Sequence, residues 1–162
     1  MHRSSTHLTT AIFLSKEPEP PLSGVGPIIG TALVNTLERV PVKSADAFVA
    51  FTGLDPRPDD SGQHRGKRRL SKRGPAELRR LLYLAAMSAA KTKTWRPLYE
   101  RYRAKGLSST ATLVILARRI ARTAWSMHTH KTTFDVERLT KQPSSAALQS
   151  GPIGRASPGM AE

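Results

Sequence analysis

Apolar residues recur at helical spacing in several stretches of the chain, and proline or glycine separates these stretches. The longest pattern begins after Ser108 or Ser109, either of which can cap a helix, and runs to about His128. Its apolar stripe consists of Leu113, Leu116, Ala117, Ile120, Ala121, Ala124 and Trp125. Arg118, Arg119 and Arg122 fall between these positions, so we expect them on the outer side of the helix.

A second long pattern follows Gly74-Pro75 and continues to about Lys91. One face of this predicted helix carries Leu78, Leu81, Leu82, Ala85, Ala86 and Ala89. An amphipathic helix must bury its apolar face against another element. We therefore predict that the stripes of the two longest helices pack together as the core.

Three shorter helices complete the pattern. Pro27 is well placed to open a helix to about Arg39. A helix over Ala45–Phe51 has Ser44 as its cap and Gly53 as its stop, and another runs from Arg96 to about Lys105 and ends at Gly106. No convincing run alternates with period two, so the sequence predicts an all-α bundle of about five helices over residues 22–137.

The two ends of the chain lack such patterns. Residues 1–21 finish in a proline-rich string, and ten of the last 21 residues are Pro, Gly or Ser, a composition that buries too little apolar surface to order. We predict a disordered leader over 1–21 and a disordered tail over 138–162. The apolar run Ala11–Leu14 is too short for a signal peptide or a membrane span, so we expect a cytoplasmic protein with no membrane partner.

The net charge of the chain indicates which kind of partner it binds. The formal net charge is +14, and between Arg65 and Arg80 eight of sixteen residues are Lys or Arg, with Glu77 as the single acid. Such density has no role in a core and predicts a polyanionic partner such as DNA, or a membrane surface, with a solvated basic loop as the alternative. The chain has no cysteine, and its five histidines lack metal-ligand spacing, so we predict no metal site.

The segment between the second and third predicted helices also carries a candidate nucleophile. Ser61 precedes Gly62 and is sterically open, so its hydroxyl can approach a phosphodiester. Asp59, Asp60 or His64 can serve as its base, while Ser71 is a rival hydroxyl whose expected role is a helix cap or phosphate ligand. The cations expected to hold phosphates are Arg65, Lys67, Arg68, Arg69, Lys72 and Arg73. Chemistry alone leaves Ser61 open as nucleophile or spectator.

A glycine turn before the first predicted helix offers a further phosphate contact. Backbone N–H groups around Gly24 and Gly26, at a helix N-terminus, resemble the turn of helix-hairpin-helix elements that bind a phosphate without reading sequence.

Taken together, the motifs resemble the C-terminal domain of bacterial insertion-sequence transposases that pair a RuvC-like DEDD domain with a serine-bearing helical domain. These transposases are similar to pilin-gene invertases and bridge-RNA-guided recombinases. The resemblance covers about residues 22–136 and rests on the strings Leu22-Ser-Gly-Val-Gly-Pro-Ile-Ile29, Ser44-Ala-Asp-Ala-Phe-Val-Ala-Phe-Thr-Gly-Leu-Asp-Pro56, Asp60-Ser-Gly62, Ser71-Lys-Arg-Gly74, Leu78-Arg-Arg-Leu-Leu-Tyr83 and Ala121-Arg-Thr-Ala-Trp125.

The resemblance implies a DNA recombinase whose nucleophilic serine lies ten residues before the Ser-Lys-Arg-Gly string, which selects Ser61. It places the Mg²⁺ of the reaction in the RuvC-like domain, for which this chain has no counterpart. We therefore expect a truncated transposase that is inactive alone and needs a RuvC-like domain in trans, with a guide RNA or a homo-oligomer as further partners. The alternative is a non-catalytic basic helical module that binds DNA or structured RNA.

Overall fold

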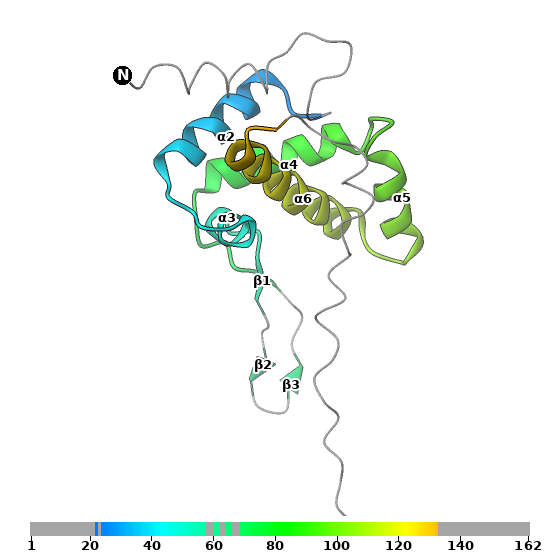
Figure 1. Cartoon of the computed structure of the whole chain (residues 1–162). Helices are drawn as coiled ribbons and strands as arrows, with labels where there is room; N and C mark the ends of the chain where they lie inside the picture. Colours follow the sequence, from blue (N-terminus) through cyan, green and yellow to red (C-terminus); the bar gives the residue numbers. More distant parts are fainter. Residues whose placement is uncertain (1–21, 23, 58–59, 62–63, 66–68, 133–162) are drawn as a thin grey trace, which may run out of the picture.

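The residues that the structure describes fold into five helices joined by short links and one longer segment (Figure 1). The computed structural model describes residues 22, 24–57, 60–61, 64–65 and 69–132. The helices are α2 (Pro27–Arg39), α3 (Ala45–Thr52), α4 (Ala76–Ala89), α5 (Arg96–Ala104) and α6 (Ser109–His130). The predicted all-α class is confirmed, and each helix ends within about two residues of its predicted bound. The predicted leader and tail lie outside the described residues.

Side-chain caps and glycines fix several of these bounds. The Ser44 hydroxyl accepts a hydrogen bond from the Ala47 N–H at 3.1 Å, and Gly53 ends α3 in the left-handed conformation. Of the two candidate caps of α6, Ser108 is the one used, since its hydroxyl accepts from the Ala111 N–H at 3.2 Å. Local signals in the sequence therefore decided where these helices begin and end.

The centre of the protein is α6, which packs against α2, α3, α4 and α5. Its contact with α4 is the most extensive, so the prediction that the stripes of the two longest helices form the core is confirmed. The buried residues on the α6 side are Leu113, Leu116, Ala117, Ile120, Ala121 and Ala124. No helix within the described residues is long and apolar enough to cross a membrane.

The prediction that three arginines face outward from α6 is wrong. Arg119 is only 7% exposed, and the side chains of Arg118 and Arg122 are 21% and 29% exposed. The reason is that helices surround α6 on several sides, so even its polar face is partly covered. Long aliphatic stems allow arginine to lie along apolar neighbours while the guanidinium finds polar partners.

The segment between α3 and α4 contains two short antiparallel pairs that the periodicity did not reveal. β1 (Pro56–Arg57) pairs with β4 (Arg69–Leu70), and β2 (Asp60–Ser61) pairs with β3 (His64–Arg65). A strand of two residues is too short to show an alternating pattern, so only pairing across the segment identifies it. Figure 1 shows β2 and β3 farther from the helices than β1.

The glycine turn before α2 is a packing contact. Gly24 has φ +96°, and a Cβ there would lie 2.5 Å from both Cα and N of Ala89 at the end of α4. Gly26, two residues on, has φ −72° and open space where its Cβ would be. Glycine is therefore required at the first position for backbone approach and is not required for space at the second.

We expect Gly24→Ala to destabilise the protein and Gly26→Ala to be tolerated. The first change combines a positive φ with overlap of the α4 backbone, and should cost more than about 1 kcal/mol of unfolding free energy. For a domain of this size that corresponds to a fall in Tm of about 4 °C or more, measured by circular dichroism. Equal Tm values for the two variants would contradict the packing role of Gly24.

Candidate nucleic-acid interface

Backbone hydrogen bonds join the two ends of the basic segment where it meets the helices. The Ser71 N–H donates to the Asp55 carbonyl at 2.8 Å, and the Lys72 N–H donates to the Gly53 carbonyl at 3.1 Å. Leu54 is 1% exposed and joins the core. We call residues 54–73 the basic hairpin. Its base is thus fixed by backbone hydrogen bonds and by one buried side chain.

Close backbone approach also holds the returning strand. Gly74 has φ +150°, and a Cβ at this position would lie 2.0 Å from the Phe51 carbonyl oxygen in α3. Lys72 adopts the left-handed conformation with φ +51°, which non-glycine residues seldom do. The chain therefore turns sharply between the end of α3 and the start of α4, and this turn aims the basic hairpin away from the core.

Ion pairs join α6 to the same region. Arg122 donates from Nε and Nη2 to Oδ1 of Asp46, in the first turn of α3, at 2.8 and 2.6 Å. Nη2 of Arg118 lies 3.8 Å from Oδ1 of Asp55, at the base of the hairpin. Burial lowers the pKa of Arg118, and the charge of Arg122 lowers it further, whereas Asp55 and Asp46 raise it. The two arginines fix α3 and the hairpin base relative to the central helix.

Ser61 has a defined register in the hairpin. The antiparallel pairing of β2 with β3 places Ser61 opposite His64 and Asp60 opposite Arg65. At the base, Arg57 is opposite Arg69. Asp59, Lys67 and Arg68 lie outside the described residues. Two of the three predicted base candidates are therefore on the same short ladder as Ser61.

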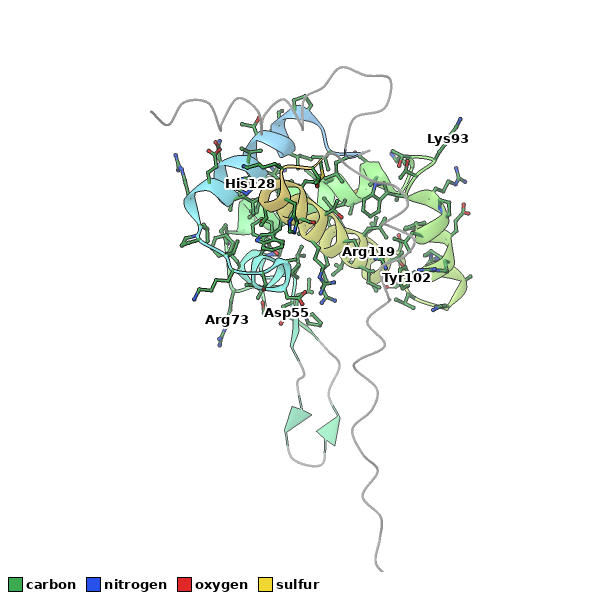
Figure 2. All side chains as sticks on the ribbon, viewed as in Figure 1. Asp55, Arg73, Lys93, Tyr102, Arg119 and His128 are labelled. Carbon is green, nitrogen blue, oxygen red and sulfur yellow. The ribbon has the colours of Figure 1, made fainter. Side chains whose placement is uncertain are left out.

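Lys72 and Arg73 are exposed at the base of the hairpin, where Figure 2 shows Arg73 pointing away from the helices. Ser71 does not cap α4 as predicted: the N-cap residue is Pro75, and no side chain caps this helix. Pro75 itself sets the backbone conformation at the start of α4. Ser71 contributes instead through its backbone N–H, which donates to the Asp55 carbonyl.

The predicted glycine contact lies apart from the hairpin. Gly24 packs on Ala89 at the C-terminal end of α4, whereas Gly74 leads from the hairpin into its N-terminal end. Helix α4 has 14 residues, which corresponds to a length of about 21 Å. We predicted that N–H groups around Gly24 and Gly26 help the basic residues of the hairpin to bind phosphates. In the fold, the glycine turn and the hairpin lie at opposite ends of α4.

The matched family model covers residues 21–103 and describes the "Transposase IS116/IS110/IS902 family". The match includes the hairpin and the helices α2 to α5 that hold it. The chain belongs to this transposase family.

Two curated relatives extend the similarity beyond the family match. An uncharacterized 44.8 kDa protein of insertion element IS116 from Streptomyces clavuligerus is 33% identical over 117 residues, which is 70% of this chain and 29% of the relative. An uncharacterized 42 kDa protein of insertion element IS900 from Mycobacterium paratuberculosis is 31% identical over 109 residues, 65% of this chain and 27% of the relative. The chain thus spans less than a third of the length of either relative.

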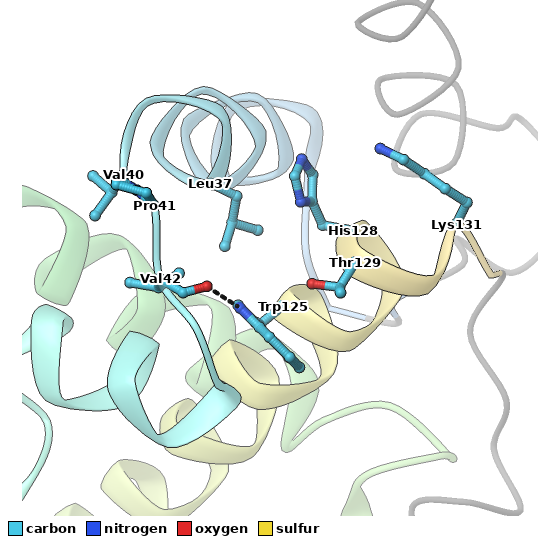
Figure 3. A pocket seen from close by; sticks show the side chains of 8 residues that line it. All are labelled: Leu37, Val40, Pro41, Val42, Trp125, His128, Thr129 and Lys131. Atoms are coloured by element: carbon cyan, nitrogen blue, oxygen red, sulfur yellow. Dashed lines mark hydrogen bonds between the residues drawn. The ribbon is translucent and has the colours of Figure 1, made fainter.

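A groove on this transposase-family domain lies between the end of α2, the link that follows it and the C-terminal end of α6 (Figure 3). It has a volume of about 300 Å³, and Trp125 borders it with its Nε1–H donated to the Val42 carbonyl at 3.3 Å. Its lining residues are Leu37, Val40, Pro41, Val42, Trp125, His128, Thr129 and Lys131. The lining offers one imidazole and one ammonium group, and no carboxylate, so it does not resemble a site for metal or acid–base chemistry.

His128 in this groove gives the domain a predicted pH dependence. Burial lowers the pKa of His128 below its usual 6.5, nearby Lys131 lowers it further, and Glu38 raises it. The unfolded chain therefore binds a proton at a higher pH than the folded protein does. Stability should be complete above about 6.5 and should be lost as the pH falls through that value toward the folded pKa. A Tm series from pH 7.5 to 4.5 measures this loss.

The matched variant is His128→Gln, which keeps a polar side chain and removes the titration. Its Tm should fall less than that of the wild type over the same range. Parallel pH profiles for the two proteins would show that His128 does not contribute.

Proposed function

We propose that this chain is the DNA-binding, serine-carrying domain of a transposase that acts as a site-specific recombinase. Membership of the IS116/IS110/IS902 transposase family supports DNA as the substrate. The observation that carries the residue assignment is the basic hairpin, in which Ser61 is paired opposite His64 at a distance from the helical body. A projecting basic ribbon suits contact with a duplex, since a two-stranded β-ribbon fits the major groove.

Ser61 is the proposed nucleophile. Its Oγ attacks the phosphorus of a phosphodiester, a new Oγ–P bond forms, and the bond from phosphorus to the departing deoxyribose oxygen breaks. His64 is the proposed base because it is the residue directly opposite Ser61, with Asp60 as the alternative. The proton leaves Oγ for this base, and an acid or water protonates the departing oxygen. The product is a phosphoserine link between protein and DNA.

Cations of the hairpin hold the phosphates in this proposal. Lys72 and Arg73 contribute from the exposed base, and the further proposed phosphate ligands of the segment are Arg65, Lys67, Arg68 and Arg69. The planar guanidinium suits phosphate because it donates two parallel hydrogen bonds. N–H groups around Gly24 and Gly26 would contact a different stretch of DNA, since α4 separates them from the hairpin.

The metal ion expected for such a reaction has no site in the described part of this chain. Among those residues no three His, Asp or Glu side chains are grouped so that they could hold an ion. A RuvC-like domain, in the same polypeptide or in trans, is the proposed source of Mg²⁺. We also propose that the protein is associated with the nucleoid. A guide RNA and a second copy of this chain are further proposed partners.

A second candidate function is non-catalytic binding of DNA or structured RNA. The net charge of +14 favours it as much as it favours the first. The two functions differ in the covalent step, so a trapped protein–DNA link distinguishes them.

We expect strong binding to duplex DNA at low salt and little dependence on sequence. Release of counterions by six or more phosphate contacts predicts a slope of log affinity against log salt of about −5 or steeper. Fluorescence anisotropy with a random-sequence duplex between 50 and 300 mM KCl measures the slope. Lys72→Ala with Arg73→Ala should reduce its magnitude by about 2 while the helical circular-dichroism signal stays constant. A flat salt dependence would refute electrostatic binding.

We expect Ser61→Ala to abolish a covalent protein–DNA adduct and to leave duplex affinity nearly unchanged. The hydroxyl is required for the link, whereas affinity comes from the cations. The measurement is adduct formation on a denaturing gel, with a RuvC-like domain of the family fused to or mixed with this chain, and Mg²⁺ present.

Ser71→Ala is the matched control because it removes the same hydroxyl from the rival serine. Its adduct should persist. An adduct that survives in Ser61→Ala and disappears in Ser71→Ala would move the nucleophile to Ser71. No adduct in the wild type, with salt-dependent binding intact, would favour the non-catalytic function.

A further inference from the structure

A second group of cations lies on α5 and on the turn that precedes it, outside the basic hairpin. Residues 91–105 contain six basic side chains and one acid, Glu100, and all seven are exposed. The basic residues are Lys91, Lys93, Arg96, Arg101, Arg103 and Lys105. The core does not account for them, because α5 itself buries only Leu98.

Two of these cations already have partners within the protein. Nε of Arg96 donates to the Glu100 carboxylate at 2.8 Å, and Nη1 of Arg103 donates to the Leu107 carbonyl at 2.5 Å. No carboxylate of the described residues forms an ion pair with the other four, which we call the α5 cations: Lys91, Lys93, Arg101 and Lys105. Exposed like charges on α5 and the residues next to its two ends repel one another, and a bound polyanion relieves that repulsion.

Tyr102 organises two of the α5 cations. Cζ of Arg101 lies 5.7 Å from the centroid of the Tyr102 ring, and Nζ of Lys105 lies 5.9 Å from it. Tyr102 is half-buried, so its ring is a fixed support for both charges. A ring that already carries two cations is not an open platform for stacking a base, which single-stranded nucleic acid would need. The arrangement therefore fits the phosphate backbone of a duplex.

The α5 cations are separate from the hairpin. The hairpin enters α4 at its N-terminal end, and the turn to α5 leaves from its C-terminal end, about 21 Å away for 14 residues. Figure 2 shows Arg73 and Lys93 at opposite sides of the molecule. Phosphates bound by the two groups are therefore different phosphates.

We propose that the α5 cations form a second contact surface for the backbone of duplex DNA, independent of the basic hairpin. This inference rests on the proposed function, because it takes DNA to be the ligand of the domain. It adds a surface that the serine chemistry does not require. A duplex bound to α5 is held by this domain even when the hairpin contacts are removed.

The test compares three double variants by anisotropy over a KCl series with a 20-bp random-sequence DNA duplex. Arg101→Ala with Lys105→Ala removes the cations on Tyr102. The charge-matched control, Arg39→Ala with Lys43→Ala, removes two exposed cations near the link from α2 to α3. The hairpin variant is Lys72→Ala with Arg73→Ala. Circular dichroism confirms that each variant is folded.

The α5 variant should reduce the magnitude of the salt slope by about 2, because each phosphate contact contributes about 0.9. The control should change the slope by clearly less, and the effects of the α5 and hairpin variants should add when combined. An α5 variant that matches the control while the hairpin variant loses its slope would overturn the inference and leave the proposed function standing. Wild-type slopes in all three variants would overturn both.

Single-stranded DNA and duplex RNA of the same length identify the ligand. Loss of affinity by the α5 variant for the DNA duplex, with a smaller loss for the single strand, is the expected result. A loss confined to single-stranded DNA would overturn the backbone assignment. A loss confined to duplex RNA would overturn DNA as the ligand and assign the surface to RNA.

Discussion

Burial of α6 is the interaction on which the rest of this domain depends. Four helices pack around it, and its residues Leu116, Ala117, Ile120 and Ala121 are fully buried. Both α6 and α4, the helix it contacts most, bury several alanines, which on α4 are Ala85, Ala86 and Ala89. A core made largely of alanine and leucine offers few partners for charge, so apart from arginines of α6 such as the buried Arg119, most described cations lie at the surface.

The same central helix also sets the geometry of the candidate site. Arg118 and Arg122 reach from α6 to Asp55 and Asp46, and thereby connect the hairpin base and α3 to the core. The backbone contacts at Gly74 and Lys72 then fix the direction in which the hairpin leaves. In the proposed function, this base carries Ser61, and the exposed Lys72 and Arg73 are available to DNA. The residues that hold the base are therefore different from those proposed to bind DNA.

Separation of the charged groups gives the domain more than one positive surface. The hairpin and α5 occupy opposite ends of α4, and the exposed Leu84 and Met87 lie on the helix between them. In the proposed function, the domain holds DNA while a strand is exchanged. Two backbone contacts at a distance resist rotation of the duplex better than one contact does, which gives the α5 surface a purpose within the proposed function.

The sequence by itself determined the helices, their caps and the core. Apolar spacing at i, i+3 and i+4 is a local property, and so are the Ser44 and Ser108 caps, which explains why these predictions were confirmed. The sequence also identified the basic segment, because the charge density of a segment depends on its composition and not on the fold. The role of Ser61 came from family resemblance and stays a prediction.

Only the tertiary structure decided what depends on contacts between distant residues. The short ladder that pairs Ser61 with His64 joins two strands of two residues each and leaves no periodic trace in the sequence. The burial of Arg119 follows from helices that surround α6, and the packing of Gly24 on Ala89 follows from the approach of two segments 65 residues apart. Local patterns fix the conformation of a segment, whereas its neighbours in space fix which of its side chains are buried, paired or free.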